Sequence, residues 1–392
     1  MKYNFDEIIE RNNTNSLKYD FAAEYGKPEG LIKLWVADMD FKTAPCVTEA
    51  LIKSAEHAVY GYSETKKDGA YFQAVKSWFA DRFDFETRPE WLVKTPGIVY
   101  AICAAINAFT EPGGSVMIQT PVYYPFKESI EANGRKCVTN SLVYENGRYF
   151  IDFDDFESKI IENNVKLFIL CSPHNPAGRV WMFDELVKMG EICLEHNVLV
   201  LSDEIHCDFV YKSYKHIIFG SINRDFLNNS IIFTAPSKTF NLAGLQLSNN
   251  FIADNNLRRK FKHEIIKTGY SQHNTMGLVS CQAAYESGGE WVDALVIYLE
   301  NSYNYAKNFI AVNLPEIKLA ELEGTYLMWL DLNAYGFSES ELDKLMAEKA
   351  GLWVSKGSVF GEEGRGFIRI NIACPFDTLK TALDRLAGAL NI

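Results

Sequence analysis

Lys238 is the residue whose position most directly indicates chemistry. It stands in Ala235-Pro236-Ser237-Lys238-Thr239, shortly after the apolar run Ile231–Phe233, which is typical of a buried strand. An unpaired ammonium group is costly to bury, so a lysine placed there often has a lowered pKa or forms an imine with a carbonyl compound. We therefore expect Lys238 to hold a carbonyl cofactor as a Schiff base. The alternative is a lysine whose stem follows the strand end while its charge reaches solvent.

Three other polar side chains follow apolar runs that read as strands. These are Tyr123, Asn175 and Asp203. Each has a purely structural interpretation: a half-buried ring, an Asn-Pro turn and a helix N-cap, respectively. However, the carboxyl ends of neighbouring parallel strands meet at one edge of a sheet, where such sheets bind ligands. We therefore expect these three side chains to meet Lys238 at one site.

A possible anion site precedes an apolar helix expected from Tyr100 to Phe109. The Pro-Gly start of that helix leaves backbone N–H groups free at Gly97, Ile98 and Val99. Together with the hydroxyl of Ser237, these groups could hold a phosphate.

These candidates match the requirements of pyridoxal phosphate. The cofactor needs a lysine for the imine, a carboxylate for its pyridine nitrogen, a donor for its phenolic oxygen, a ring to stack on it and donors for its phosphate. In that order, the sequence offers Lys238, Asp203, Asn175, Tyr123, and Gly97-Ile98-Val99 with Ser237.

The elements around these residues indicate an α/β fold. Continuous apolar strands alternate with helices between residues 116 and 252, which is typical of a mostly parallel sheet covered on both faces. Near the C-terminus the pattern changes to strands at 325–332, 352–354 and 367–372 with two helices, and Ser338 and Glu341 fit a capping box. We expect a large domain of residues 46–287. Residues 1–45 and 288–392 would form a smaller α+β domain.

Composition excludes several other classes. The 392 residues carry a net charge of −12 without a Lys/Arg cluster, which argues against nucleic acid or an anionic membrane as a partner. Eight scattered cysteines without a C-x-x-C pair, and a charged N-terminus without a secretory apolar region, predict a cytoplasmic protein. The run His206-Cys207-Asp208 lacks a second ligand cluster, so we expect no metal site.

Three motifs carry a resemblance to a known family. They are Ser172-Pro173-His174-Asn175-Pro176-Ala177-Gly178, Ser202-Asp203-Glu204-Ile205-His206 and Ser237-Lys238-Thr239-Phe240-Asn241. In this order they resemble the fold-type I pyridoxal-phosphate enzymes of the class I/II aminotransferase superfamily. Residues 37–41, 61–63, 326–332 and 361–371 are most similar to its cystathionine β-lyase (C–S lyase) branch, the MalY/PatB type. The resemblance implies a seven-stranded, mostly parallel sheet.

The resemblance also implies roles around the cofactor. Lys238 would form the Schiff base and, with Tyr123, take part in catalysis. Asp203 would pair with the pyridine nitrogen, Asn175 with the phenolic oxygen, and Tyr123 would stack on the ring. His206 takes the place of a tyrosine found in many aminotransferases.

Further implied roles concern substrate and subunits. Arg369 would bind the substrate carboxylate bidentately, with Asn175 and Tyr62 beside it. Tyr62, or Tyr60 in its place, would reach the phosphate of a neighbouring subunit, which implies a homodimer with shared active sites. Many aminotransferases have an arginine on the phosphate where this sequence has Gln246. Phosphate binding would then depend on backbone N–H groups and hydroxyls.

The activity implied is β-elimination at a C–S bond. L-cystathionine would give homocysteine, pyruvate and ammonia, and cysteine would give sulfide, pyruvate and ammonia. An aminotransferase using the same site is the alternative. A third hypothesis, a regulatory protein that binds a transcription factor and keeps residual lyase activity, rests on family analogy alone.

Overall fold

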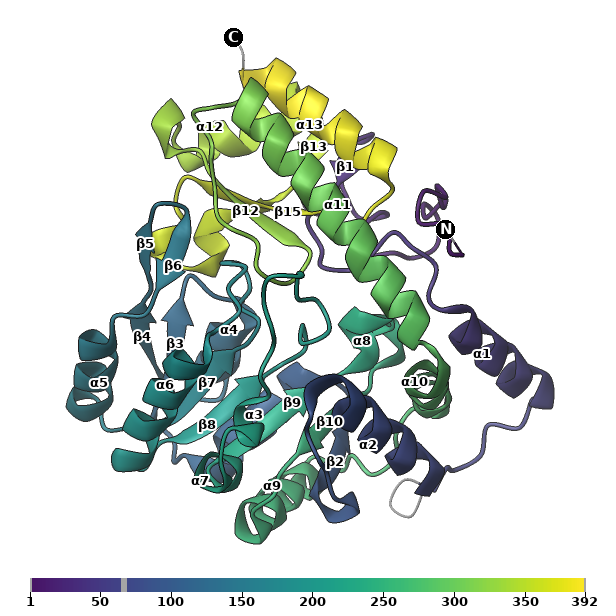
Figure 1. Cartoon of the computed structure of the whole chain (residues 1–392), viewed down its shortest axis with the longest axis vertical. Helices are drawn as coiled ribbons and strands as arrows, with labels where there is room; N and C mark the ends of the chain where they lie inside the picture. Colours follow the sequence, from purple (N-terminus) through teal and green to yellow (C-terminus); the bar gives the residue numbers. More distant parts are fainter. Residues whose placement is uncertain (1, 65–68, 391–392) are drawn as a thin grey trace.

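A seven-stranded sheet forms the centre of the larger part of the molecule (Figure 1). The computed structural model describes residues 2–64 and 69–390. The strand order is β2-β10-β9-β8-β7-β3-β4. The strands are β2 (Leu92–Thr95), β3 (Ser115–Thr120), β4 (Lys136–Ser141), β7 (Val165–Cys171), β8 (Leu199–Asp203), β9 (Ser230–Thr234) and β10 (Ser248–Phe251). β10 is antiparallel to β2 and β9, whereas β9, β8, β7, β3 and β4 pair in parallel. The predicted α/β fold is confirmed.

Helices cover both faces of this sheet because its central strands are apolar on both sides. In β7, Leu167 and Ile169 contact one buried cluster, whereas Phe168 and Leu170 contact the other. The first cluster includes α3 (Ile98–Phe109), α4 (Pro125–Ala132) and α9 (Asn255–Lys267). The second includes α2 (Gly69–Phe83), α5 (Phe153–Glu162), α6 (Phe183–Glu195), α7 (Arg224–Asn228) and α10 (Thr275–Ser287).

A smaller antiparallel sheet lies in the C-terminal part, in the order β11-β12-β15-β14. Its strands are β11 (Lys318–Leu319), β12 (Leu327–Asp331), β14 (Ser355–Lys356) and β15 (Phe367–Asn371). The helices α11 (Gly289–Asn313), α12 (Glu339–Lys344) and α13 (Phe376–Leu390) belong to the same part of the chain. The capping box of Ser338 and Glu341 is confirmed at the start of α12. The hairpin of β5 (Val143–Glu145) and β6 (Arg148–Phe150) forms a two-stranded sheet of its own.

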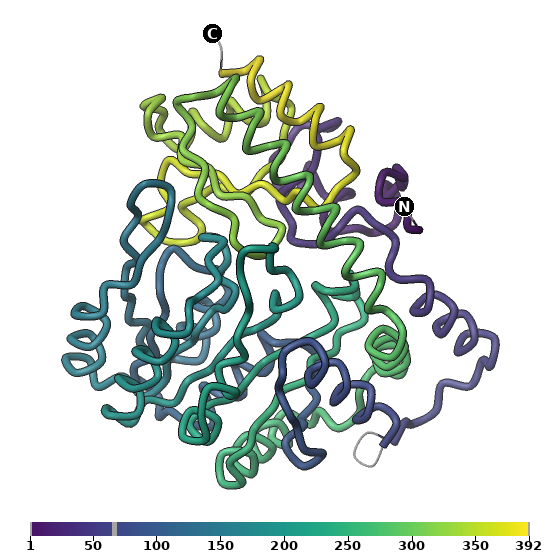
Figure 2. The backbone as a smooth tube through the Cα atoms, viewed as in Figure 1, coloured from purple at the N-terminus to yellow at the C-terminus, as the bar shows by residue number. Residues whose placement is uncertain are grey.

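The N-terminal segment lies beside the last elements of the chain (Figure 2). β1 (Ile32–Lys33) pairs in parallel with β13 (Leu352–Trp353), and the Asn371 N–H donates to the Leu34 carbonyl at 2.9 Å. α1 (Pro45–His57) then leads back to the larger part. The proposed division at residues 46–287 stays a prediction, although the seven-stranded sheet falls inside that range and the four-stranded sheet outside it.

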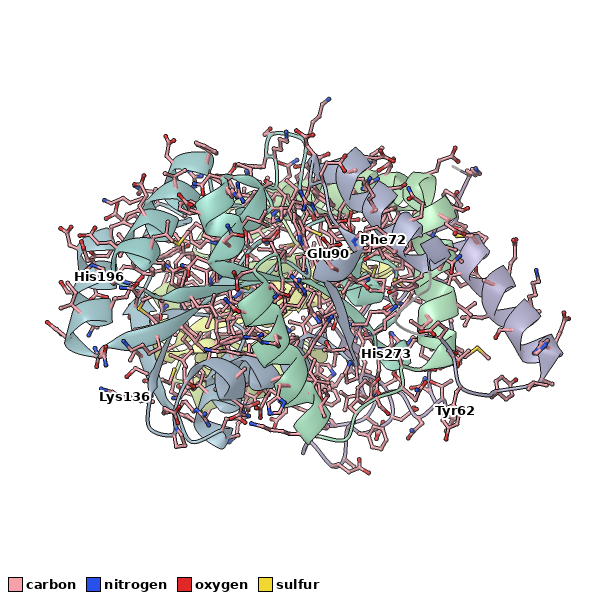
Figure 3. The ribbon with its side chains drawn as sticks, turned by 90° about the horizontal axis from the view of Figure 1, so that it is seen from below. Tyr62, Phe72, Glu90, Lys136, His196 and His273 are labelled. Atoms are coloured by element: carbon pink, nitrogen blue, oxygen red, sulfur yellow. The ribbon has the colours of Figure 1, made fainter. Side chains whose placement is uncertain are left out.

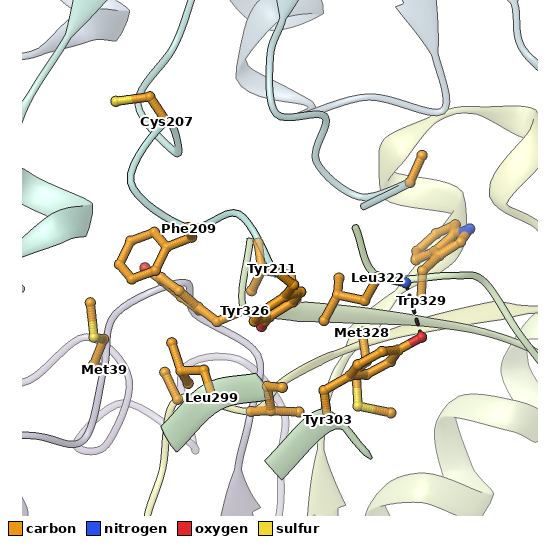
Figure 4. Close-up of a cluster of buried hydrophobic side chains, with 14 of the residues drawn as sticks. Met39, Cys207, Phe209, Tyr211, Leu299, Tyr303, Leu322, Tyr326, Met328 and Trp329 are labelled. Carbon is orange, nitrogen blue, oxygen red and sulfur yellow. Dashed lines mark hydrogen bonds between the residues drawn. The ribbon is translucent and has the colours of Figure 1, made fainter. Parts of the chain in front are cut away.

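One buried apolar cluster extends from the large sheet to the small one. Figure 4 shows Phe209 and Tyr211, which follow β8, packed near Leu299 and Tyr303 of α11 and near Tyr326. The Leu322 N–H donates to the hydroxyl of Tyr303 at 3.1 Å. This shared core fixes the relative placement of strand ends in the two sheets. Within the described residues, no helix combines the length and the apolar character needed to cross a bilayer.

Candidate active site

A short helical turn, α8 (Pro236–Thr239), presents Lys238 directly after β9. Pro236 at its first position has the φ angle that a helix start requires. The buried hydroxyl of Thr239 donates to Asp208 Oδ2 at 2.7 Å, which anchors the turn. Lys238 Nζ donates to the carbonyl of Ala37 at 2.7 Å. The lysine amine is therefore turned into the molecule, and the surface-lysine alternative is wrong.

The predicted side chains do converge at the strand ends. A cavity of about 150 Å³ lies there. Nine residues singled out in the sequence line it: Gly97, Ile98, Val99, Tyr123, Asn175, Asp203, His206, Ser237 and Lys238. They come from the connections after five strands of the large sheet, β2, β3, β7, β8 and β9, as expected for a ligand site beyond the carboxyl ends of parallel strands.

The amine of Lys238 and the carboxylate of Asp203 have shifted pKa values. Burial, with a further contribution from the charge of Arg369, lowers the pKa of Lys238 to about 8, against the opposing effects of Asp38 and Asp203. Burial and the neighbouring Glu204 raise the pKa of Asp203 to about 7. An N–H bond from Ile205 at 3.1 Å opposes this rise only in part. A cationic N–H placed in the cavity would stabilise the ionised form of Asp203.

His206 follows Asp203 in a series of turns, not in a helix. The N–H of Cys207 donates to Glu204, and that of Phe209 donates to the His206 carbonyl. The interpretation of Asp203 as a helix N-cap is therefore wrong. Burial and the nearby charges of Lys238 and Arg369 hold the pKa of His206 well below its ordinary value. Its Nδ1 is buried and has no hydrogen-bond partner within residues 2–64 and 69–390.

The N-terminus of α3 forms one wall of the cavity. Gly97 has φ +145° and ψ +163°, a conformation essentially restricted to glycine. The Thr95 hydroxyl donates to the Gly97 carbonyl at 3.2 Å and fixes this entry into the helix. The first-turn N–H groups that follow have no intrahelical acceptors, as at any helix start. Gln246, which stands where many aminotransferases have an arginine, also lines the cavity.

Arg369 reaches the site from β15 in the small sheet. It does not line the cavity itself, but Nη1 donates to Asn175 Oδ1 at 3.0 Å. Nη2 donates to the Trp35 carbonyl at 2.8 Å and to the Ser355 hydroxyl at 3.2 Å. The guanidinium also lies over the ring of Phe360, with its carbon 4.7 Å from the ring centre. These contacts fix the plane of the guanidinium beside the cavity.

Tyr62 and Tyr60 are not part of the site in a single chain. Tyr62 is 94 % exposed and lies at the periphery of the molecule (Figure 3). Tyr60 is 61 % exposed, and its hydroxyl donates to the carbonyl of Ala55. The predicted reach of Tyr62 to a neighbouring subunit stays a prediction.

Some residues that line the cavity were not predicted from the sequence. Cys171, Ile205, Ala243 and Leu247 also line the cavity, and their residue types gave no signal. The segment from Leu34 to Phe41 contributes both to the core and to the site. Leu34, Met39 and Phe41 are buried in the core, whereas Ala37 lines the cavity.

This set of groups fits pyridoxal phosphate. The cavity brings together an inward amine, a buried carboxylate with a raised pKa, an amide, a phenol ring and a helix N-terminus. The first four correspond to the imine, pyridine nitrogen, phenolic oxygen and ring face of the cofactor, and the helix N-terminus suits its phosphate.

Comparison with known proteins agrees with this geometry. The model of the family "Aminotransferase class I and II" matches residues 29–386. The chain is 42 % identical to cystathionine beta-lyase PatB of Bacillus subtilis, over 99 % of this chain and 100 % of that protein. It is 32 % identical to protein MalY of Escherichia coli over 99 % of each chain.

A solved structure of similar fold comes with its cofactor. Cystalysin from Treponema denticola, which contains pyridoxal 5'-phosphate, superposes with a TM-score of 0.96 at 38 % identity and covers 100 % of this chain and 99 % of its own. A pyridoxal-phosphate-bound putative aminotransferase from Clostridium difficile also gives a TM-score of 0.96, at 41 % identity, covering 99 % of this chain and 100 % of its own. On the match of its sequence and fold, the chain belongs to the class I and II aminotransferase family.

Proposed function

We propose that this protein is a pyridoxal-phosphate-dependent lyase that cleaves the C–S bond of a sulfur amino acid by β-elimination. The observation that carries the proposal is the meeting of Lys238, Asp203 and Asn175 at one cavity, with Arg369 bonded to Asn175 beside it. The similarity to PatB over nearly the whole chain favours elimination among the reactions that this site supports.

The cofactor, when bound, withdraws electrons from the substrate Cα. Lys238 would attach it covalently, and Asp203 would hold a proton on its ring nitrogen. Tyr123 would lie against the ring, and Asn175 would donate to the phenolic oxygen. The N–H groups of Ile98 and Val99 and the Ser237 hydroxyl would bind the phosphate, since Gln246 brings no positive charge.

Lys238 is also suited to move protons. With a pKa of about 8, an appreciable fraction of its amine is neutral near pH 7, so it can take the proton from the substrate Cα. The C–S bond then breaks, and the leaving thiolate takes a proton from Lys238 or Tyr123. The released 2-aminoacrylate hydrolyses to pyruvate and ammonia. With L-cystathionine the thiol product is homocysteine, and with cysteine it is sulfide.

The substrate carboxylate would bind to Arg369. Its contacts to Asn175, Trp35 and Ser355 hold the guanidinium plane and use three of its five N–H groups. The Nε–H, which is buried and has no hydrogen-bond partner within residues 2–64 and 69–390, and the second N–H of Nη1 would remain for the carboxylate.

We also propose a homodimer with shared active sites, in the cytoplasm. The segment of residues 59–62 leaves apolar surface that a second copy would cover, since Val59 is 69 %, Tyr60 61 % and Tyr62 94 % exposed. All eight cysteines are free thiols, which supports a reducing compartment.

Mixed dimers test the sharing of sites. Lys238→Ala and Tyr62→Ala chains are each expected to be nearly inactive. In a dimer of one of each, one site keeps both Lys238 and the partner's Tyr62, so activity should return. No recovery on subunit exchange would contradict shared sites.

The reaction is tested by incubating purified holoenzyme with L-cystathionine and measuring pyruvate and free thiol. We expect equimolar formation of both without any added 2-oxo acid. Turnover that depends on a 2-oxo acid, with little pyruvate, would show an aminotransferase instead.

A further inference from the structure

The irregular segment Val36–Phe41 is held from two sides. Asn371, at the end of β15, donates through Nδ2 to the carbonyls of Val36 at 2.7 Å and Asp38 at 2.6 Å. Asn241, three residues after Lys238, accepts from the Met39 N–H at 3.0 Å. The Asn241 amide also donates to the carbonyls of Met39 at 2.9 Å and Phe41 at 3.1 Å. The carbonyl between the two Asn371 bonds, that of Ala37, is therefore fixed in direction.

The Ala37 carbonyl receives two donors from the site. Lys238 Nζ lies 2.7 Å from it, and the hydroxyl of the fully buried Tyr326 lies 3.0 Å from it. An amine that donates one N–H to this carbonyl can direct its lone pair in only two of three staggered directions.

Next to Ala37, the Asp38 carboxylate belongs to an ion cluster reached from the N-terminal segment. Arg11 donates to both Asp38 oxygens, at 2.8 and 3.4 Å, and also to Asp40 at 2.6 Å. The fully buried Lys18 lies 2.9 Å from Asp40 and 3.5 Å from Asp38. The cluster thus joins two carboxylates to two cations behind the carbonyl that binds Lys238.

We propose that segment Val36–Phe41 docks the free amine of Lys238: the Ala37 carbonyl orients it, and the Arg11–Asp38 ion pair sets how readily its nitrogen holds a proton. Asp38 and Arg11 are thus positioning residues that act through Lys238. The inference rests on the proposed function, because it assigns Lys238 the role of proton carrier.

The charges that face Lys238 come from several elements. Asp38 and Asp203 favour its protonated form, and Arg369 on β15 opposes it. His206, Tyr123 and Tyr326 are uncharged neighbours in the same site. Burial lowers the pKa of His206 and raises the pKa of both tyrosines, which favours the neutral form of each. Among these groups, Asp38 is paired with cations that lie outside the site, Arg11 at 2.8 Å and Lys18 at 3.5 Å, so its influence depends on them and most on the nearer Arg11.

Removing Asp38 and removing Arg11 should have opposite effects on the electrostatic potential at the nitrogen of Lys238. Asp38→Asn removes a negative charge, so the nitrogen of Lys238 should lose its proton at a lower pH. Arg11→Gln leaves Asp38 less neutralised, so the same nitrogen should keep its proton to a higher pH. A loss of structure alone would not produce shifts of opposite sign.

The experiment is a pH titration of the acid limb of kcat, which reports the ionisation of Lys238 in the substrate complex, where its amine is free. A second readout is the pH dependence of the rate at which added pyridoxal phosphate develops its visible absorption on the cofactor-free protein, because only the neutral amine reacts with the aldehyde. We expect the midpoint to fall by roughly half to one unit in Asp38→Asn and to rise by a similar amount in Arg11→Gln. The double variant should return close to the wild-type midpoint, because both charges are then gone.

Lys27→Gln and Asp343→Asn are the matched controls. They remove the same charges from an ion pair of 2.5 Å that is buried to a similar extent and lies outside the site, and they should leave the midpoint unchanged. The inference would be overturned if both test variants shifted the midpoint in the same direction, or if correctly folded variants did not shift it. A double variant whose midpoint lies further from wild type than those of the single variants would also overturn it. If wild-type protein shows no visible band with pyridoxal phosphate, the proposed function fails instead.

Discussion

Arg369 Nη1 donates to Asn175 Oδ1 at 3.0 Å, across 194 residues of sequence. The bond joins a strand of the small sheet to the loop after β7 of the large sheet. The residue proposed to bind substrate is therefore oriented by a residue proposed to bind the cofactor. Substrate recognition depends on how the two sheets are set against each other.

Replacing Arg369 with lysine should affect substrate more than cofactor. A lysine keeps the charge but cannot contact Asn175, Trp35 and a carboxylate at once. We expect KM to rise by roughly 10- to 100-fold with the visible absorption retained. Arg365→Lys, at an exposed arginine paired with Glu362, is the control and should leave KM unchanged. An unchanged KM in Arg369→Lys would contradict the assignment.

Lys238→Ala should abolish covalent attachment of the cofactor. The visible absorption of the bound form should disappear, and kcat should fall by about three orders of magnitude or more, because both attachment and proton transfer are lost. Absorption spectra and steady-state rates measure these effects, with Lys42→Ala, an exposed lysine paired with Glu7, as the control. A retained band would refute the attachment point.

Asp203 should make the free energy of unfolding of the cofactor-free protein depend on pH. Its folded-state pKa of about 7 lies above the ordinary 3.8, so the folded state binds the proton more tightly. The stabilisation is fully present below pH 4 and is lost as pH rises through 7. Between pH 5 and 8, the free energy of unfolding of the wild type should therefore fall by on the order of 2 kcal/mol relative to that of Asp203→Asn. Urea unfolding at both pH values measures this, and parallel pH profiles for the two proteins would argue against it.

Trp329 should be important for stability. Its buried indole donates to the Tyr149 hydroxyl at 2.9 Å and stacks on Phe367, with ring centres 5.1 Å apart. Trp329→Ala should lower the free energy of unfolding by about 3–5 kcal/mol. Val312→Ala, at a side chain 79 % exposed, should change it by less than about 0.5 kcal/mol. Equal effects of the two substitutions would show that the small sheet contributes little to the cooperative core.

The site could be predicted from the sequence because the signals for its side chains are local. Lys238, Asp203 and Asn175 each follow an apolar strand, and parallel strands deliver such residues to one edge. The capping box of Ser338 and Glu341 was likewise readable, since both partners lie within one turn.

Features that depend on distant parts of the chain were harder to predict. β2, with the sequence Leu-Val-Lys-Thr, has no long apolar run, and its place beside β10 is set by tertiary pairing. The antiparallel direction of β10 has no signature in Ser-Asn-Asn-Phe. The acceptor for Lys238 is a backbone carbonyl, which any residue at position 37 would supply. Tyr62 would show its role only beside a second copy.

The two Asn371 bonds to the segment after β1 also set an order of events during synthesis. Residues 36–38 leave the ribosome early, whereas the amide that holds them in place follows more than three hundred residues later. Ribosome-bound chains that end between Lys238 and β15 therefore contain the lysine but not the amide that fixes its carbonyl acceptor. Cofactor capture in its final geometry becomes one of the last steps in making the protein.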